Sequence, residues 1–207
     1  MNVKRTLAVM AVTGAALAGF PAAAMADDIV VNGNYTVPKG KTIDGNLTVK
    51  NGYLHIKGKV KGNVKQTGSG AVRVFASGTV EGNVDEYNAG GLRIDGLVTG
   101  NATERSTGSL VVSATGTLKG NAHEHDGGLL KVVGRVDGNA LERGTGGIRV
   151  RGYLDGNAEE WGTGHIIIRG HVDGNAIERA KGNIVIHRGA TLEGDAEENG
   201  PGRVVRH

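Results

Sequence analysis

Apolar and polar residues alternate along most of this chain in short runs that recur at a nearly constant interval. A Gly-Asn or Gly-Asp pair begins at residues 45, 62, 82, 100, 120, 138, 156, 174 and 194, so the intervals are 17 to 20 residues. Self-similarity at such a period is typical of stacked repeats that share one continuous core. The pattern therefore predicts a solenoid, in which equivalent residues of successive repeats are neighbours in space.

Each repeat carries apolar residues on three short sides separated by glycine. The first side has two apolar residues around a variable one, which is the alternation of a strand with one buried face. These pairs are Leu54/Ile56, Val72/Val74, Leu92/Ile94, Leu110/Val112, Leu130/Val132, Ile148/Val150, Ile166/Ile168 and Ile184/Ile186. The second side adds Ile43, Val60, Val80, Val98, Leu118, Val136, Leu154, Val172 and Leu192, and the third adds Leu47, Val64, Val84, Ala102, Ala122, Ala140, Ala158, Ala176 and Ala196. We predict an all-β fold, a parallel β-helix of triangular section with about nine coils over residues 43–207.

The corners of this solenoid are predicted from glycine and asparagine. We expect glycine there because it adopts positive φ without steric cost, and asparagine because its side chain can hydrogen-bond neighbouring backbone. Length varies only between the first and second sides, at residues 75–78, 113–116 and 187–191. The Gly-Asn column is therefore expected to be structural, with the two-residue insertions bulging outward at one corner.

The N-terminal part of the chain has a different character. Residues 1–26 resemble an export signal, with Lys4 and Arg5, an apolar run over 7–20, and Ala24-Met25-Ala26 before Asp27. That run is too short for a transmembrane helix, and no later segment is long and apolar enough. We expect residues 27–42 to cap the N-terminal edge of the solenoid, and the mature chain to be secreted, held at the cell surface or periplasmic.

Composition narrows the classes of function. Without Lys4 and Arg5, 22 basic residues face 21 acidic ones, so the mature chain is nearly neutral and nucleic acid is not an expected partner. The chain has no cysteine, which excludes thiol chemistry and disulfides. Its 37 glycines and 3% aromatic residues do not suit a globular core, but they suit a thin core of stacked β-branched residues.

Two acidic columns follow from the repeat. One holds Gln66, Glu86, Glu104, Glu124, Glu142, Glu160, Glu178 and Glu198. Carboxylates stacked at the strand spacing of about 4.8 Å repel by about 1 to 3.5 kcal/mol per neighbouring pair, so they must be screened, protonated or paired. We expect an exposed corner, where the cations Arg105, His125, Arg143 and Arg179 could pair with the column, and we expect unrelieved repulsion to raise the glutamate pKa values.

The second acidic column, Asp137, Asp155, Asp173 and Glu193, is expected on an outward position of the last four coils. We interpret both columns as a solvated, salt-bridged face and predict no metal site. The alternative is that the two rows bind Ca²⁺, which takes several oxygen ligands. Its candidate ligands are Glu142, Glu160, Glu178, Asp137, Asp155 and Asp173.

Other side chains suggest surface binding. The first side carries outward Arg73, Arg93, Lys131 and Arg149, with Arg151, Arg169 and Arg188 close by. This basic face could attract anionic surface glycans or a neighbouring rod, although solubility alone would explain it. Trp161 could stack on a sugar ring. The pair of histidines in His123-Glu124-His125 lacks the further ligands that a distinctive metal site needs.

No catalytic or cofactor site is predicted. The sequence contains no Ser, His and Asp constellation, no phosphate loop and no metal-binding cysteine pattern. Catalytic residues occur at one place in a chain, whereas every prominent feature of this chain is repeated. We expect a protein that is not an enzyme and needs no cofactor.

The run GRVDGNALERGTGGIRVRGYLDGNAEE at residues 134–160, with its G-x-V-x-G-N-A spacing, resembles the bactofilins, the polymer-forming cytoskeletal β-helix family. The resemblance extends over about residues 43–207. It implies a right-handed β-helix that assembles end to end into filaments without nucleotide and acts as a scaffold. The export signal and the regular glutamate column depart from that family's usual pattern.

The C-terminal residues supply a candidate assembly edge. Arg203, Val204, Val205 and Arg206 enter a further first-side strand that has no following coil, and an unpaired strand is a template for another chain. We therefore expect an exported structural protein that forms homopolymers, as fibres or a surface matrix. The alternatives are a monomeric adhesin or glycan-binding module, and a calcium-binding solenoid.

Overall fold

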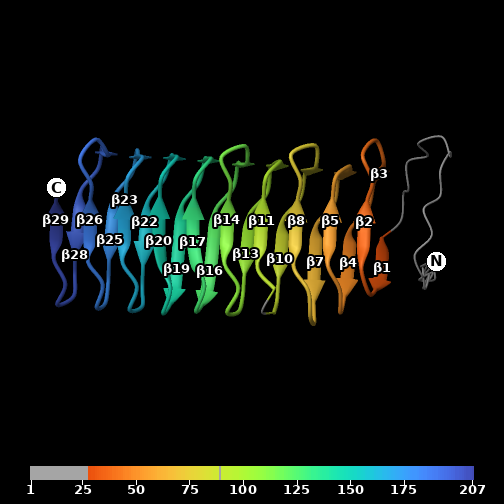
Figure 1. Cartoon of the computed structure of the whole chain (residues 1–207), viewed down its shortest axis with the longest axis horizontal. Helices are drawn as coiled ribbons and strands as arrows, with labels where there is room; N and C mark the ends of the chain where they lie inside the picture. Colours follow the sequence, from red (N-terminus) through yellow and green to blue (C-terminus); the bar gives the residue numbers. More distant parts are fainter. Residues whose placement is uncertain (1–27, 89) are drawn as a thin grey trace, which may run out of the picture.

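The computed structural model describes residues 28–88 and 90–207, which form a straight rod of stacked coils (Figure 1). In these residues every regular element is a β-strand, all strand pairs are parallel, and the strands form three sheets. Among the described residues no helix is both long and apolar enough to span a bilayer. The expected export signal, residues 1–26, lies outside the described residues.

Each coil contributes one strand to each of three sides, which keep the names first, second and third side that were given to the three sets of apolar residues above. The first side contains β2 (Tyr35–Val37), β5 (Leu54–Ile56), β8 (Val72–Val74), β11 (Leu92–Ile94), β14 (Leu110–Val112), β17 (Leu129–Val132), β20 (Gly147–Val150), β23 (Ile166–Ile168), β26 (Ile184–Ile186) and β29 (Val204–Arg206). The second side contains β3 (Thr42–Ile43), β6 (Lys59–Val60), β9 (Thr79–Val80), β12 (Leu97–Val98), β15 (Thr117–Leu118), β18 (Arg135–Val136), β21 (Tyr153–Leu154), β24 (His171–Val172) and β27 (Thr191–Leu192). The third side contains β1 (Ile29–Asn32), β4 (Leu47–Lys50), β7 (Val64–Thr67), β10 (Val84–Glu86), β13 (Ala102–Glu104), β16 (Ala122–Asp126), β19 (Ala140–Gly144), β22 (Ala158–Glu160), β25 (Ala176–Glu178) and β28 (Ala196–Glu198).

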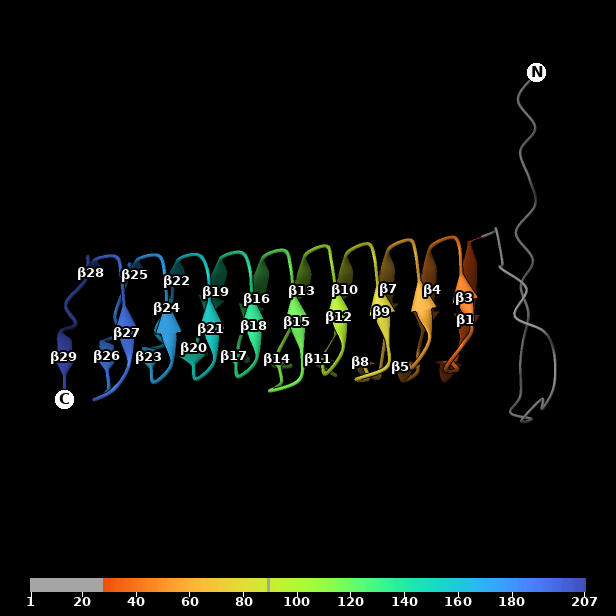
Figure 2. The ribbon, with the colours of Figure 1, turned by 90° about the horizontal axis from the view of Figure 1, so that it is seen from above.

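Successive coils stack in register, as the sequence predicts. On the first side Leu130 pairs with Ile148, Ile148 with Ile166, and Ile166 with Ile184. All four side chains are fully buried. Seen from above, the coils follow one another along the rod in chain order (Figure 2). The core is thus a narrow apolar column between three walls, and the all-β triangular solenoid is confirmed.

The corner between the first and second sides absorbs the changes in repeat length. Most coils cross it in two residues, but four residues connect β8 to β9, β14 to β15 and β26 to β27, at the positions expected from the sequence. A fourth such loop joins β2 to β3 (Figure 1). The loops close with short backbone hydrogen bonds, such as Gly78 N–H to Phe75 C=O at 2.7 Å.

The Gly-Asn corners are structural, but the reason expected for their glycines is wrong. Gly82 does not have positive φ. A Cβ on Gly82 would lie 2.6 Å from the carbonyl oxygen of Gly62 in the previous coil, closer than real Cβ contacts. Glycine is therefore required here because the backbones of successive coils approach closely, and not because of an unusual dihedral angle.

The asparagines of these corners form a continuous ladder. The side-chain oxygen of each accepts a hydrogen bond from the backbone N–H of its counterpart in the next coil, at 2.8 to 2.9 Å, through Asn46, Asn63, Asn83, Asn101, Asn121, Asn139, Asn157, Asn175 and Asp195. Asp28 begins the ladder by accepting from Asn46 N–H at 2.7 Å. Each amide thus satisfies a corner N–H group.

The segment 27–42, expected as a cap, is itself built as a coil within its described part. Its strands β1 and β2 pair in parallel with β4 and β5, and Val37 is fully buried. The solenoid therefore begins about one coil earlier than the first Gly-Asn pair indicates. In the described rod, β1, β2 and β3 lie at one end and β27, β28 and β29 at the other.

Candidate functional site

The glutamate column lies inside the solenoid. Gln66, Glu86, Glu104, Glu124, Glu142, Glu160 and Glu178 are all fully buried. The expectation of an exposed, salt-bridged corner is wrong for this column. Strand alternation explains the correction: in β22, Ala158 points inward and Glu159 outward, so Glu160 must point inward again. The two-residue spacing from alanine to glutamate is the sequence signal that could have shown this.

None of the four cations expected to pair with this column contacts it, and two of them pair with other acids. Arg105 forms an ion pair with Asp85 at 3.6 Å, and Arg179 pairs with Glu159 at 3.6 Å. Both acids occupy outward positions on the third side. The buried carboxyl groups have no cationic partner among the described residues, so another interaction must compensate their desolvation.

One oxygen of each buried carboxyl group accepts a hydrogen bond from the turn that joins the third side to the first. Glu124 Oε1 accepts from Gly128 N–H at 2.9 Å, and Glu160 Oε1 accepts from Gly162 N–H at 2.9 Å and from Gly164 N–H at 3.2 Å. Equivalent bonds are made by Glu86, Glu104, Glu142, Glu178 and Glu198. Each glutamate therefore holds the turn of its own coil.

The other oxygen of each of these carboxyl groups is buried and has no N–H donor. Successive side chains from Glu86 through Glu178 are neighbours along this column, close enough that each carboxyl group affects the pKa of the next. We name the six residues from Glu86 to Glu178 in this column the inner carboxyl row. Burial without a cationic partner favours the protonated form of a carboxyl group.

The pKa values agree with this geometry. Burial, followed by the interaction with the next glutamate, raises the pKa of Glu86 to about 8 and that of Glu124 to about 9. Burial also raises the pKa of Glu160 and of Glu178 to about 7, and it raises that of Glu104. The direction of shift predicted from the sequence is confirmed for these five glutamates, with burial rather than repulsion as the larger cause.

The two ends of the inner carboxyl row differ. Toward the N-terminus its column continues as Gln66, Val49 and Val31. The amide of Gln66 donates to the carbonyl oxygens of Ser69 at 3.0 Å and Gly52 at 3.2 Å, so it needs no proton from a neighbour. Toward the C-terminus Glu198 follows and is only partly buried.

The second acidic column, which we name the outer acid row, lies on the outside of the second side as expected. Its members are Asp137, Asp155, Asp173 and Glu193. Arg135 bridges the first two, contacting Asp137 through Nε and Asp155 through a terminal nitrogen at 3.2 Å. The structure does not bring the two acidic columns together, because Glu142, Glu160 and Glu178 face the core while Asp137, Asp155 and Asp173 face solvent.

The two histidines around Glu124 behave as expected from alternation. His123 and His125 lie on the outer surface with ring centroids 6.4 Å apart, while Glu124 points into the core. The three side chains do not converge on one point.

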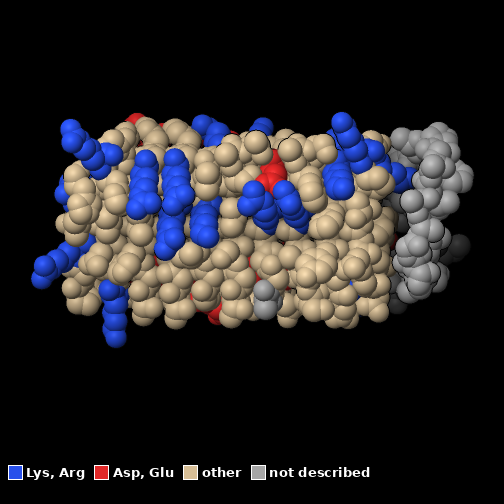
Figure 3. Space-filling model, viewed as in Figure 1, with Lys and Arg blue, Asp and Glu red and all other residues tan. Residues whose placement is uncertain are grey.

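A basic patch occupies the outside of the first side (Figure 3). Near the middle of the rod, Arg73 and Arg93 both pair with Asp95, at 2.7 and 2.8 Å. Further along, Lys131, Arg149, Arg151 and Arg169 surround shallow grooves and form no ion pair with the described residues. We name these last four residues the cationic patch.

Trp161 lies outside the third side with 48% of its surface exposed. Arg143 and Arg179 lie over its ring, at 5.4 and 4.7 Å from the centroid, and its Nε1 donates to Glu159 at 3.3 Å. A sugar that stacks on Trp161 would therefore have to displace a guanidinium group. The tryptophan and the cationic patch lie on different sides of the rod.

The predicted assembly edge lies at the end of the described rod. Strand β29 pairs with β26 and has no partner on its other side among the described residues. Val204 follows Ile184 in the inward column and is 39% exposed.

Comparison with known proteins supports the resemblance seen in the sequence. Residues 35–126 match the sequence model of the family Bactofilin, described as polymer-forming and cytoskeletal. Together with the β-solenoid, this match over less than half of the chain supports a relationship to that family of structural, self-assembling proteins.

Three curated proteins match shorter stretches, and all are named anti-sigma-W factor RsiW. Identity is 43% over 60 residues for the protein of Bacillus subtilis, 42% over 57 for that of Halalkalibacterium halodurans and 40% over 60 for that of Bacillus licheniformis. These stretches cover 28 to 29% of this chain and 26 to 29% of the relatives. The chain thus spans less than a third of their length. No solved structure matches.

Proposed function

We propose that this chain, which resembles the bactofilins in fold and over residues 35–126, is an exported, non-enzymatic structural protein whose rods join end to end into fibres or a surface scaffold. One observation carries this proposal. At both ends of the described rod, each of the three sheets finishes in a strand with a free edge. A second copy that docks there extends three sheets at once, and unpaired strand edges favour such addition.

The backbone of β29 supports addition at the C-terminal end. Arg203 C=O accepts from Ile184 N–H, and His207 N–H donates to Ile186 C=O, both at 3.0 Å. Alternate residues of a strand bond to opposite neighbours. Val204 and Arg206 therefore direct their N–H and C=O groups toward the next copy.

The apolar contribution to docking comes from the same coil. Leu192, Ala196 and Val204 continue three inward columns whose preceding members, Val172, Ala176 and Ile184, are fully buried. The three residues of the last coil remain partly exposed in the single rod. Covering them with another coil would remove apolar surface from water, which favours association.

Electron microscopy and sedimentation of the mature chain over a range of concentrations test this proposal. We expect rods that lengthen in multiples of one chain as concentration rises. The variant Val204→Pro removes an N–H that points to the next copy, so it should block growth at that end while leaving the bonds of β29 to β26 intact. Val204→Thr keeps the N–H and is the matched control. Monomers alone at high concentration would contradict the proposal.

The cationic patch favours a second candidate function, adhesion to anionic cell-surface polymers. Its four side chains have no acidic partner among the described residues, and their positions repeat along the rod with the coils, as in a charged polymer. We expect a salt-dependent affinity for a polyanion such as teichoic acid. Arg149→Glu should weaken binding, whereas Arg93→Glu, outside the patch, is the control. Trp161→Ala tests separately whether a sugar ring stacks on the indole.

A further inference from the structure

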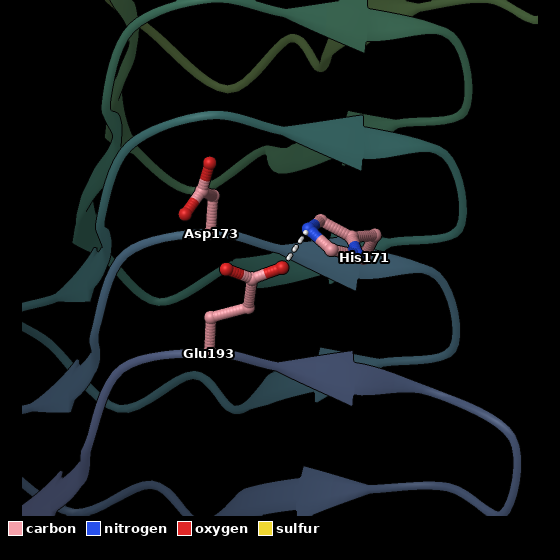
Figure 4. Close-up of side chains that lie close together, drawn as sticks. All are labelled: His171, Asp173 and Glu193. Carbon is pink, nitrogen blue, oxygen red and sulfur yellow. Dashed lines mark ion pairs between the residues drawn. The ribbon is translucent and has the colours of Figure 1, made fainter.

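We propose that His171, Asp173 and Glu193 bind one divalent transition-metal ion, such as Zn²⁺, on the outside of the second side. One ligand atom from each of the three side chains lies within 4.8 Å of the others. His171 Nε2 is 3.2 Å from Glu193 Oε1, and Asp173 lies beside them (Figure 4).

The stacking of coils explains why these residues converge. His171 and Asp173 are two residues apart, so both point outward from the end of β24. β24 pairs with β27 in a register that sets Val172 beside Leu192 and therefore Asp173 beside Glu193. The three ligands thus come from two adjacent coils whose backbones are held together by strand pairing and by the asparagine ladder at the corners.

An internal comparison indicates that this position calls for a cation. Two coils earlier, Arg135 occupies the slot of His171, because Arg135 pairs with Tyr153 and Tyr153 with His171 along the same column. The guanidinium of Arg135 bridges Asp137 in its own coil and Asp155 in the next. Asp173 and Glu193 are the same pair of positions relative to His171, and neither pairs with a lysine or arginine among the described residues. A bound metal ion would supply there the charge that Arg135 supplies between Asp137 and Asp155.

Neighbouring groups hold two of the ligands in place. The ring of Tyr153 stacks on His171, with centroids 4.7 Å apart and planes 10° apart. The hydroxyl of Tyr153 donates to Asp173 Oδ2 at 3.2 Å. Groups that orient metal ligands in this way, without contacting the ion themselves, contribute to affinity. The hydroxyl also leaves Asp173 Oδ1 free to coordinate.

The donor set selects the class of ion. One imidazole nitrogen and two carboxylate oxygens suit Zn²⁺ and other first-row transition ions, with metal–ligand distances of about 2.0–2.2 Å. Calcium prefers oxygen ligands alone, so the histidine argues against it. The three ligand atoms need only side-chain rotations to close around an ion, and water would complete the coordination.

Calorimetry with Zn²⁺ on the untagged mature chain tests the proposal. We expect one equivalent of saturable binding and a rise in melting temperature, since an ion that binds only the folded chain stabilises it. His171→Arg reproduces the arrangement of Arg135, so it should keep the fold and weaken Zn²⁺ binding by at least about tenfold.

A second variant separates this site from the other histidines. His123→Ala removes one of the pair on the third side and should leave the Zn²⁺ affinity unchanged. Absence of saturable Zn²⁺ binding would overturn the proposal, as would an affinity that His171→Arg leaves unchanged or that His123→Ala abolishes. The experiment uses dilute single rods and is independent of end-to-end assembly, so failure of either proposal is seen separately.

Discussion

The inner carboxyl row and the outer acid row solve the same electrostatic problem in different ways. Both place acidic side chains at equivalent positions of successive coils. In the inner row, Glu124 is fully buried, accepts a hydrogen bond from a turn N–H, and has a pKa that burial raises to about 9. In the outer row, Asp137 and Asp155 are relieved by the guanidinium of Arg135.

Burial explains the difference. A cation brought into the narrow core would itself lose hydration, whereas a proton neutralises a buried carboxyl group without adding volume. On the outside, water screens the acids, and placing an arginine there carries little desolvation penalty. The inner row is therefore a structural part of the turns, and the outer row is a surface whose cation can vary from coil to coil.

The largest expected difference between the rows comes from replacing an acid with leucine. Glu124→Leu leaves Gly128 N–H without its acceptor and interrupts the column of carboxyl groups between Glu104 and Glu142. Each buried polar group left without a partner costs about 1–3 kcal/mol, so we expect the free energy of unfolding to fall by about 2–4 kcal/mol. Chemical denaturation measures this change.

Two control variants sharpen the result. Glu124→Gln keeps an acceptor for the turn and can donate as Gln66 does, so it should recover most of the loss. Asp155→Leu in the outer row should change the free energy of unfolding by less than about 1 kcal/mol. Equal losses in Glu124→Leu and Asp155→Leu would remove the distinction between the rows.

The next effect is a dependence of stability on pH. Glu86 and Glu124 have folded pKa values of about 8 and about 9, above the ordinary value of 4.5. Their contribution to stability is complete below pH 4.5 and is lost as pH rises through the folded values. We expect the free energy of unfolding to fall between pH 7 and 9, by up to about 1.4 kcal/mol per pH unit for each proton that the folded chain retains.

The choice of the interval from pH 7 to 9 and a double variant make this prediction specific to the inner carboxyl row. Burial lowers the pKa of His55, His123 and His125 from 6.5, so these histidines change charge below the interval. The double variant Glu86→Gln/Glu124→Gln should flatten the pH dependence. A wild-type stability that is constant or rises from pH 7 to 9 would show that the row does not hold protons.

The smallest effect is expected in the outer row. Arg135→Ala removes the bridge between Asp137 and Asp155 and the contact with the ring of Tyr153. Exposed ion pairs contribute about 0.2–1 kcal/mol and are screened by salt. We expect a slight fall in melting temperature at low ionic strength that shrinks in high salt; a loss as large as that of Glu124→Leu would contradict the comparison.

Most of the fold could be predicted from the sequence because neighbours in space are equivalent residues of the repeat. Apolar pairs such as Ile148/Val150 recur once in each repeat with one residue between them. This spacing predicts both the strand and the face of the strand that is buried. The sequence predicts the positions of the corner glycines correctly but gives the wrong reason for them. Gly82 is required because the backbone of the coil before it lies too close for a Cβ atom. The sequence of a single repeat does not reveal such a contact between coils.

The inner row was harder to predict because glutamate is almost never fully buried without a partner. The partners here are turn N–H groups of the same coil. The neighbours of each carboxyl group are identical side chains in adjacent coils, which only the stacked structure brings together. The convergence of His171 with Asp173 and Glu193 was missed for a similar reason. His171 comes from a position that holds tyrosine and arginine in the two coils before it and threonine, leucine or lysine in earlier coils, so the repeat did not mark it.

Infrared spectroscopy of the carboxyl groups tests the protonation of the inner row most directly. At pH 7.5 ordinary carboxyl groups are ionised, whereas the raised pKa values of Glu86 and Glu124 predict protonated carboxyl bands in the folded wild-type chain. These bands should weaken in Glu86→Gln/Glu124→Gln and disappear on unfolding. A folded wild-type chain at pH 7.5 with only carboxylate bands would contradict the account.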